Sequence, residues 1–119
     1  MRRLPALIAA ASASAVLAGP AGAASFDCSK ATHPDEIAIC DNPNLSALDS
    51  EMGGLWFAYS KIPFLMGMNG NRQDEAQAFL QTRAACGANV SCLASAYDQR
   101  IATLKQQISS SIEEQCSAQ

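Results

Sequence analysis

Residues 86–93, with the sequence CGANVSCL, decide the fold of this chain. Two cysteines stand six positions apart there, and apolar residues continue at helical spacing on either side. Gly87 can adopt the left-handed backbone geometry that ends a helix, and Asn89 or Ser91 can cap the start of the next one. A disulfide between Cys86 and Cys92 would hold the two helices as an antiparallel hairpin. The sequence therefore predicts a small, all-α, disulfide-stapled domain.

The rest of the chain brings the expected number of helices to about four. Apolar residues recur at spacings of three and four over residues 45–62, 72–86 and 91–112, which predicts three amphipathic helices. A shorter helix is expected to begin near Pro34 and to end near Cys40. The side chains on the three stripes are Leu45, Leu48, Met52, Leu55, Trp56, Tyr59 and Ile62, then Ala76, Phe79, Leu80 and Arg83, then Leu93, Tyr97, Ile101, Leu104, Ile108 and Ile112.

The segment between the second and third predicted helices, residues 63–71, is unusually apolar for a loop. It either folds over the open end of the helical core or protrudes and docks on a partner protein. In the second case, basic residues at its two ends would join the contact. The candidate contact residues are Lys61, Phe64, Leu65, Met66, Met68 and Arg72.

Residues 1–24 have the anatomy of a secretory signal peptide. A basic start is followed by an uncharged apolar run to Gly19 and by the small residues AGAA at positions 21–24. We expect this leader to be removed, which leaves one domain over residues 25–119 in the periplasm or outside the cell. The residues before Cys28 do not form a lipid-attachment pattern, and no later segment is apolar enough to span a bilayer, so we expect neither lipid anchoring nor membrane insertion.

The charge of the chain is acidic. Loss of Arg2 and Arg3 with the leader changes the formal charge from −3 to −5. An acidic exported protein is a poor ligand for nucleic acid or for an anionic membrane surface. A basic protein is a plausible partner, and the alternative is that the charge only maintains solubility.

Five cysteines in so short an exported chain indicate disulfides, although the sequence leaves their pairing open. Proximity favours Cys28 with Cys40 and Cys86 with Cys92. Cys116 is left near the end of the chain, as a free thiol, as a link between two copies of an otherwise monomeric protein, or as a tail residue without a role, which is the favoured alternative. The spacings do not resemble the paired C-x2-C pattern of a zinc site, so we expect no metal.

The sequence contains no recognisable catalytic constellation. His33 is the only histidine, and it stands where it would cap a helix or remain solvated. No nucleophile elbow, phosphate-binding glycine loop or dinucleotide fingerprint occurs. The paired carboxylates lie at predicted helix ends, where the helix dipole explains them. We therefore expect no enzyme and no cofactor.

Four charged residues lie on or beside the apolar stripes, where a solvated charge would not be expected. Because arginine can satisfy a partly buried carboxylate with two hydrogen bonds, we predict ion pairs between helices among them. The four residues are Glu36, Asp49, Arg83 and Arg100.

The cysteine framework resembles the LprI-type lysozyme-inhibitor N-terminal domain family over nearly all of residues 25–119. The most specific block is Cys-Leu-x3-Tyr-x2-Arg-Ile-x2-Leu, from Cys92 to Leu104. The resemblance implies a helical, disulfide-bonded exported domain and, from the family's namesake, inhibition of lysozyme. The residues that carry it are Cys28, Glu36, Ile39, Cys40, Asp41, Pro43, Leu45, Leu48, Asp49, Tyr59, Phe79, Leu80, Arg83, Cys86, Cys92, Leu93, Tyr97, Arg100, Ile101 and Leu104.

Two functions follow as hypotheses. The first is an exported protein inhibitor of lysozyme (muramidase) that acts by stoichiometric binding, because lysozymes are typically basic and would attract an acidic inhibitor. The second is a non-inhibitory module that binds another protein of the cell envelope. A hydrolase is the least favoured alternative.

Overall fold

The computed structural model describes residues 24–63 and 66–118, and of residues 66–69 it describes the backbone alone. The predicted signal peptide lies outside the described residues, except for Ala24. A short 3-10 helix, η1 (Cys28–Lys30), precedes four α-helices, and the described residues contain no strand. The predicted all-α fold class is confirmed. The α-helices are α1 (Pro34–Asp41), α2 (Pro43–Lys61), α3 (Met66–Ala85) and α4 (Val90–Ser117).

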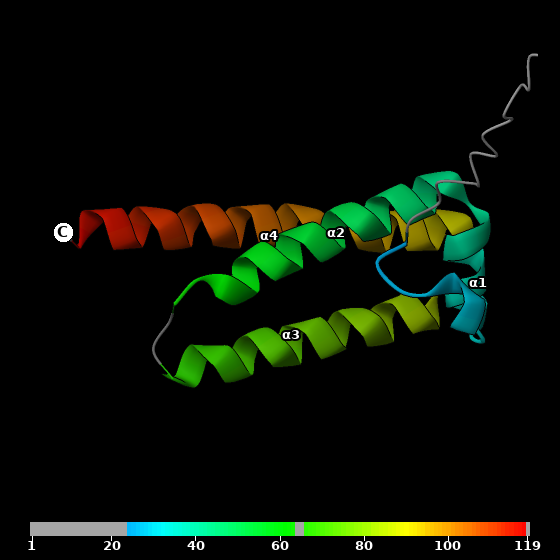
Figure 1. The fold of residues 1–119 in the computed structure, drawn as a ribbon, viewed down its shortest axis with the longest axis horizontal. Coiled ribbons are helices and arrows are strands. Elements are labelled where there is room, and N and C mark those ends of the chain that lie inside the picture. Colours follow the sequence, from blue (N-terminus) through cyan, green and yellow to red (C-terminus); the bar gives the residue numbers. More distant parts are fainter. Residues whose placement is uncertain (1–23, 64–65, 119) are drawn as a thin grey trace, which may run out of the picture.

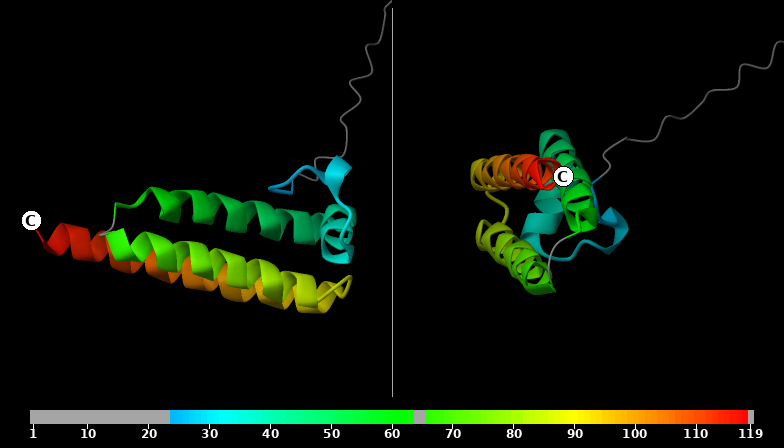
Figure 2. Two further views of the ribbon diagram at one scale, coloured as in Figure 1. Left: turned by 90° about the horizontal axis from the view of Figure 1, so that it is seen from below. Right: turned by 90° about the vertical axis from the view of Figure 1, so that its left-hand side faces the viewer.

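The three long helices lie side by side, with α3 running opposite to α2 and α4 (Figure 1). Seen along their axes, they occupy the corners of a triangle (Figure 2). Helix α4 packs extensively along α2 and less extensively along α3, while α2 and α3 make few contacts with each other. The short helix α1 closes one end of the bundle, where it contacts both α2 and α3.

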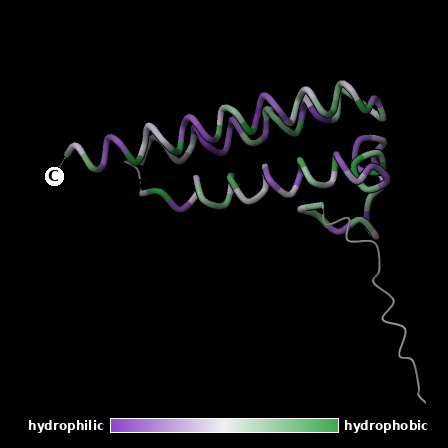
Figure 3. Tube along the Cα trace, turned by 90° about the horizontal axis from the view of Figure 1, so that it is seen from above, coloured by the Kyte–Doolittle hydropathy of each residue, from purple (hydrophilic) through white to green (hydrophobic). Residues whose placement is uncertain are grey.

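The core is concentrated at the end of the bundle that α1 closes. Leu93 and Tyr97 of α4 are fully buried there, and the ring of Tyr97 lies edge-on to that of Phe79 at 5.3 Å between centroids. Hydrophobic and hydrophilic residues alternate along every helix (Figure 3). Within the described residues, no helix combines the length and hydrophobicity needed to cross a membrane. The core cluster consists of Ile39, Leu45, Phe79, Leu93, Ala96, Tyr97 and Ile101.

Local sequence signals account for the helix boundaries. Asn42 caps α2, since its side-chain oxygen accepts hydrogen bonds from the backbone N–H groups of Asn44 and Leu45. Asn89 caps α4 in the same way through the N–H of Cys92. Gly87 adopts φ of 55° between α3 and α4, a conformation that glycine tolerates without steric cost.

Both favoured disulfides are present. Cys28 is bonded to Cys40 with 5.8 Å between the Cα atoms, and this bond ties η1 to α1. Cys86 is bonded to Cys92 with 5.5 Å between the Cα atoms, and it closes the predicted antiparallel hairpin of α3 and α4. Cys116 is free and exposed.

Two predicted boundaries are wrong. The apolar loop over residues 63–71 does not exist as such, because α3 begins at Met66. Near the start of α3, the Arg72 guanidinium donates hydrogen bonds to the carbonyl oxygens of Tyr59 and Ile62. These bonds hold the start of α3 against the end of α2. Helix α4 continues to Ser117, well past Ile112, because glutamate and glutamine favour helix and the Ser111 hydroxyl is satisfied by the Gln107 carbonyl. The last turns of α4 therefore extend beyond the rest of the bundle (Figure 1).

Removal of either disulfide should destabilise the protein by an amount that depends on the length of the loop it closes. On the chain-entropy relation, replacing Cys86 and Cys92 by serine should lower the free energy of unfolding by about 2 kcal/mol, and replacing Cys28 and Cys40 by about 3 kcal/mol. Chemical denaturation of both double variants measures these losses. A Cys116→Ser variant is the control and should unfold like the parent protein. Equal stability of all three variants and the parent would contradict a stabilising role of the two bonds.

Candidate functional site

A cluster of charged side chains lies buried where α1, α2 and α3 meet. The Arg83 guanidinium on α3 donates a hydrogen bond through Nε to Oδ2 of Asp35 at 2.8 Å. It also lies 3.9 Å from Oε1 of Glu36 and 4.0 Å from Oδ1 of Asp49. The structure thus brings together three of the four residues predicted to form ion pairs. It adds Asp35, which sequence reasoning assigned to the helix dipole alone.

The carboxylate of Asp49 has no solvent exposure and is held by partners from several directions. The Tyr97 hydroxyl of α4 donates to its Oδ1 at 2.7 Å, and the backbone N–H of Ser25 donates to its Oδ2. Burial, and then the hydrogen bond to Asp49, raise the pKa of the Tyr97 hydroxyl well above its ordinary value. Tyr97 therefore remains a proton donor to Asp49 throughout the physiological range.

Glu36, at the edge of this cluster, also caps the start of α1. Its Oε2 accepts hydrogen bonds from the backbone N–H groups of Thr32 and His33, which precede α1. These bonds lower the pKa of Glu36 below its ordinary value. His33 stands at the N-cap position of α1, one of the two placements that the sequence left open.

The fourth predicted member, Arg100, makes a different pair. Its guanidinium lies 3.5 Å from Glu75 of α3 and 5.9 Å from the centroid of the Trp56 ring on α2. The prediction that Arg100 pairs with Glu36 or Asp49 is wrong, because Arg100 stands too far along α4 from the end that α1 closes. Glu75 carried no sequence signal other than its position four residues before Phe79 on the inner side of α3.

Of the residues predicted to contact a partner, the structure describes the side chains of Lys61 and Arg72 alone. Arg72 is buried, at 5% exposure, and it binds backbone carbonyls of this chain, so its assignment to a partner contact is wrong. Lys61 is exposed, with its ammonium 5.1 Å from the centroid of the Phe57 ring. Phe64 and Leu65 lie outside the described residues, as do the side chains of Met66 and Met68.

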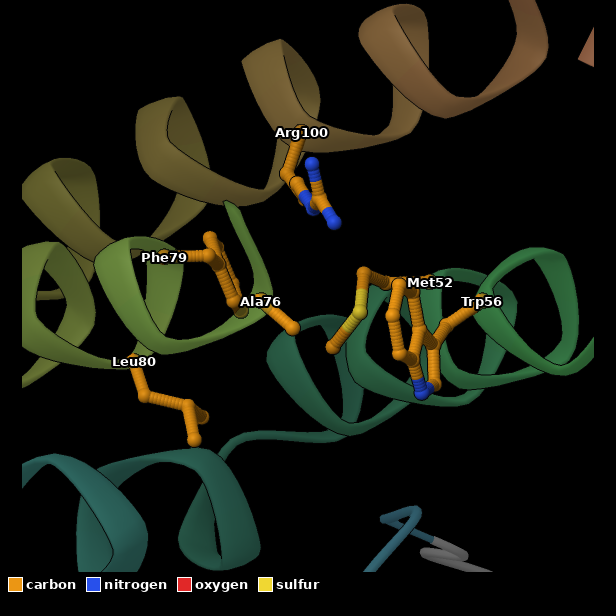
Figure 4. A pocket seen from close by; sticks show the side chains of 6 residues that line it. All are labelled: Met52, Trp56, Ala76, Phe79, Leu80 and Arg100. Carbon is orange, nitrogen blue, oxygen red and sulfur yellow. The ribbon is translucent and has the colours of Figure 1, made fainter. Parts of the chain in front are cut away.

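An apolar groove lies elsewhere, between α2 and α3, and Arg100 of α4 lines one side of it (Figure 4). Its volume of about 120 Å³ is below the range of small-molecule sites, roughly 300–1,000 Å³, and suits a single apolar side chain. Leu80 is the lining residue that points outward most, at 41% exposure. The lining residues are Met52, Trp56, Ala76, Phe79, Leu80 and Arg100.

The outer surface is more acidic than the net charge suggests. Of the eleven Asp and Glu side chains, only Asp35 and Asp49 are buried. All three arginines of residues 24–118 are buried, which leaves three lysines as the cations at the surface of this region. Lys30 and Lys105 lie beside Asp27 and Glu51, respectively. Glu36 and Glu75 are half-buried beside Arg83 and Arg100, so seven carboxylates face outward with little cationic charge to offset them.

Within residues 24–63 and 66–118, no group of three His, Cys, Asp or Glu side chains is arranged to hold a metal ion. A comparison of the chain with protein-family models, with curated proteins and with solved structures finds no match.

Replacement of Arg83 by methionine should lower the free energy of unfolding by about 3 kcal/mol, because Asp35 and Asp49 would remain buried without their cation. Arg100→Met is the matched control. It should cost about 1 kcal/mol or less, since the side chain of Glu75 is 40% exposed and can be solvated. Guanidinium denaturation of both variants measures the difference. Equal losses of unfolding free energy in the two variants would show that Arg83 stabilises the fold no more than Arg100 does.

Stability should fall at alkaline pH. The pKa of Tyr97 is raised on folding above its ordinary value of 10.0, so the folded state holds this proton more tightly than the unfolded state does. Its contribution is therefore complete well below pH 10 and is lost as the pH rises further, with a slope that approaches about 1.4 kcal/mol per pH unit once the unfolded tyrosine is fully ionised. Denaturation between about pH 9 and about pH 12 measures this slope. Tyr97→Phe should remove most of it, and an unchanged slope in that variant would assign the effect to another group.

Proposed function

We propose that the protein is exported and inhibits lysozyme (muramidase) by stoichiometric binding. The cysteine framework and the Cys92 to Leu104 block supply the resemblance to lysozyme-inhibitor domains. Two disulfides suit an oxidising compartment such as the periplasm or the exterior of the cell. They also stiffen the scaffold, so that less conformational entropy is lost when a partner binds.

The observation that carries the proposal is the division of charge between interior and surface. Arg72, Arg83 and Arg100 are all used inside the fold, whereas seven carboxylates are exposed. Such a surface attracts a basic protein and raises the rate of association, an effect that salt screens. A basic lysozyme has the complementary charge.

The groove between α2 and α3 supplies the apolar part of the proposed contact. Partner side chains that fill a small desolvated pocket contribute most of the binding energy in typical interfaces, while charged rims affect mainly the rate. Leu80 at the mouth of the groove and Trp56 at its side would contact the incoming side chain. We therefore propose this groove as the partner contact, in place of residues 63–71. Lys61, which lies over the Phe57 ring, is exposed and can also contact a partner.

The test is a lysis assay in which the purified exported protein is added to a lysozyme and a suspension of bacterial cell walls. We expect the rate of clearing to fall to zero at about one inhibitor per enzyme and inhibition to weaken as salt is added. Absence of inhibition across several classes of lysozyme would reject the proposal. It would favour the module that binds another envelope protein through the same surface.

The groove is tested by Leu80→Glu, which places a charge where an apolar side chain should enter. We expect at least a tenfold loss of inhibitory potency with little change in stability, because Leu80 is already 41% exposed. Ile112→Glu is the matched control. It adds the same charge at a 52% exposed position on α4, about 18 Å along that helix from Arg100, and should inhibit like the parent. Equal potency of the two variants would exclude the groove from the contact.

A further inference from the structure

The first described residues are attached to the buried carboxylate of Asp49. The main-chain nitrogen of Ser25 donates a hydrogen bond to Oδ2 of Asp49 at 2.5 Å, while Oδ1 is occupied by the Tyr97 hydroxyl. Asp49 has no exposure, but Ser25 lies at the surface. The hydrogen bond of the Ser25 nitrogen, which is part-buried, thus joins a surface residue to the buried cluster.

The neighbouring residues fit this attachment closely. A Cβ atom at Gly53, one turn after Asp49 on α2, would lie 2.9 Å from the Cβ of Ser25, which is closer than real Cβ contacts allow. The side chain of Phe26 packs against the core, and its ring lies 5.4 Å from the Arg83 guanidinium. The glycine at position 53 therefore leaves room for Ser25 to lie against α2, and the packing of Phe26 keeps Ser25 near Asp49.

The charges of the cluster favour a second cation at this point. Asp35, Glu36 and Asp49 share the single guanidinium of Arg83, and its short contact is with Asp35 rather than with Asp49. A buried carboxylate is stabilised most by a cation in hydrogen-bond contact. Of the two groups that donate hydrogen bonds to Asp49, the Tyr97 hydroxyl and the Ser25 nitrogen, proteolysis can convert only the nitrogen into a cation.

We propose that Asp49 is a binding site for the new amino terminus of the mature chain. Hydrolysis of the peptide bond between Ala24 and Ser25 by a signal peptidase consumes one water molecule, leaves a carboxylate on Ala24 and releases Ser25 as an α-ammonium. This ammonium forms an ion pair with Asp49 and locks the N-terminal segment, α2 and α4 together. The inference rests on the predicted cleavage after the small residues at 21–24, and it is independent of lysozyme inhibition.

The position of cleavage is tested first. The full-length chain is expressed and exported, and the intact mass of the mature protein is measured. Ser25 should be the first residue. A chain that begins at any other residue would overturn the proposal, because one residue displaces the ammonium by about 3.5 Å.

The ion pair is then tested by moving the charge and keeping the hydrogen bond. A mature protein with one glycine added before Ser25 retains an N–H at Ser25 but carries its ammonium on the glycine. We expect its equilibrium constant for unfolding to be about tenfold larger than that of the protein that begins at Ser25, because a charged donor binds a carboxylate more strongly than a neutral one. Equal constants would overturn the proposal.

The partner is identified by repeating the comparison in Asp49→Asn. There the added glycine should change the unfolding constant less than twofold, and a tenfold change would assign the effect to another group. A second measurement covers the case in which Asp49→Asn does not fold. The α-amine of the protein that begins at Ser25 should react with an acylating reagent at least tenfold more slowly than that of the glycine-extended protein. Equal rates would overturn the proposal.

Discussion

The buried guanidinium of Arg83 is the interaction on which the rest of the structure depends. Helix α3 makes few contacts with α2 and packs less extensively on α4 than α2 does, so apolar burial alone fixes it weakly. Three arginines hold it instead. Arg72 joins its first described turns to the end of α2, Arg100 reaches Glu75 in its middle, and Arg83 joins its last turns to α1. The Cys86–Cys92 disulfide then fixes its end to α4.

This use of arginine shapes the surface as well as the core. Because the guanidinium groups are turned inward, the exterior of the described region keeps only lysines as cations and becomes strongly acidic. Because polar contacts rather than apolar packing hold α3, the space between α2 and α3 is incompletely filled and remains as a groove. The acidic exterior and the apolar groove, on which the proposed function rests, thus have one structural cause.

The N-terminal segment belongs to the same arrangement. The Cys28–Cys40 bond, the Phe26 ring beneath Arg83 and the Ser25 nitrogen on Asp49 bring the first described residues onto the charged cluster. Formation of the Cys28–Cys40 disulfide therefore acts on the junction of α1, α2 and α3, and the proposed removal of the leader would act at the same place. Two disulfides are typical of proteins that fold in an oxidising compartment.

The sequence by itself determined the helical class, the two disulfides and the turn at Gly87, because these depend on spacing and on the conformational preference of nearby residues. It also marked Glu36, Asp49, Arg83 and Arg100 as charges on inner faces. Only the tertiary structure decided that Arg83 bonds Asp35, 48 positions away, that Arg100 bonds Glu75, and that Arg72 is internal. Helical periodicity shows which face of a helix is buried, but it does not show which faces meet, since that depends on how the helices cross.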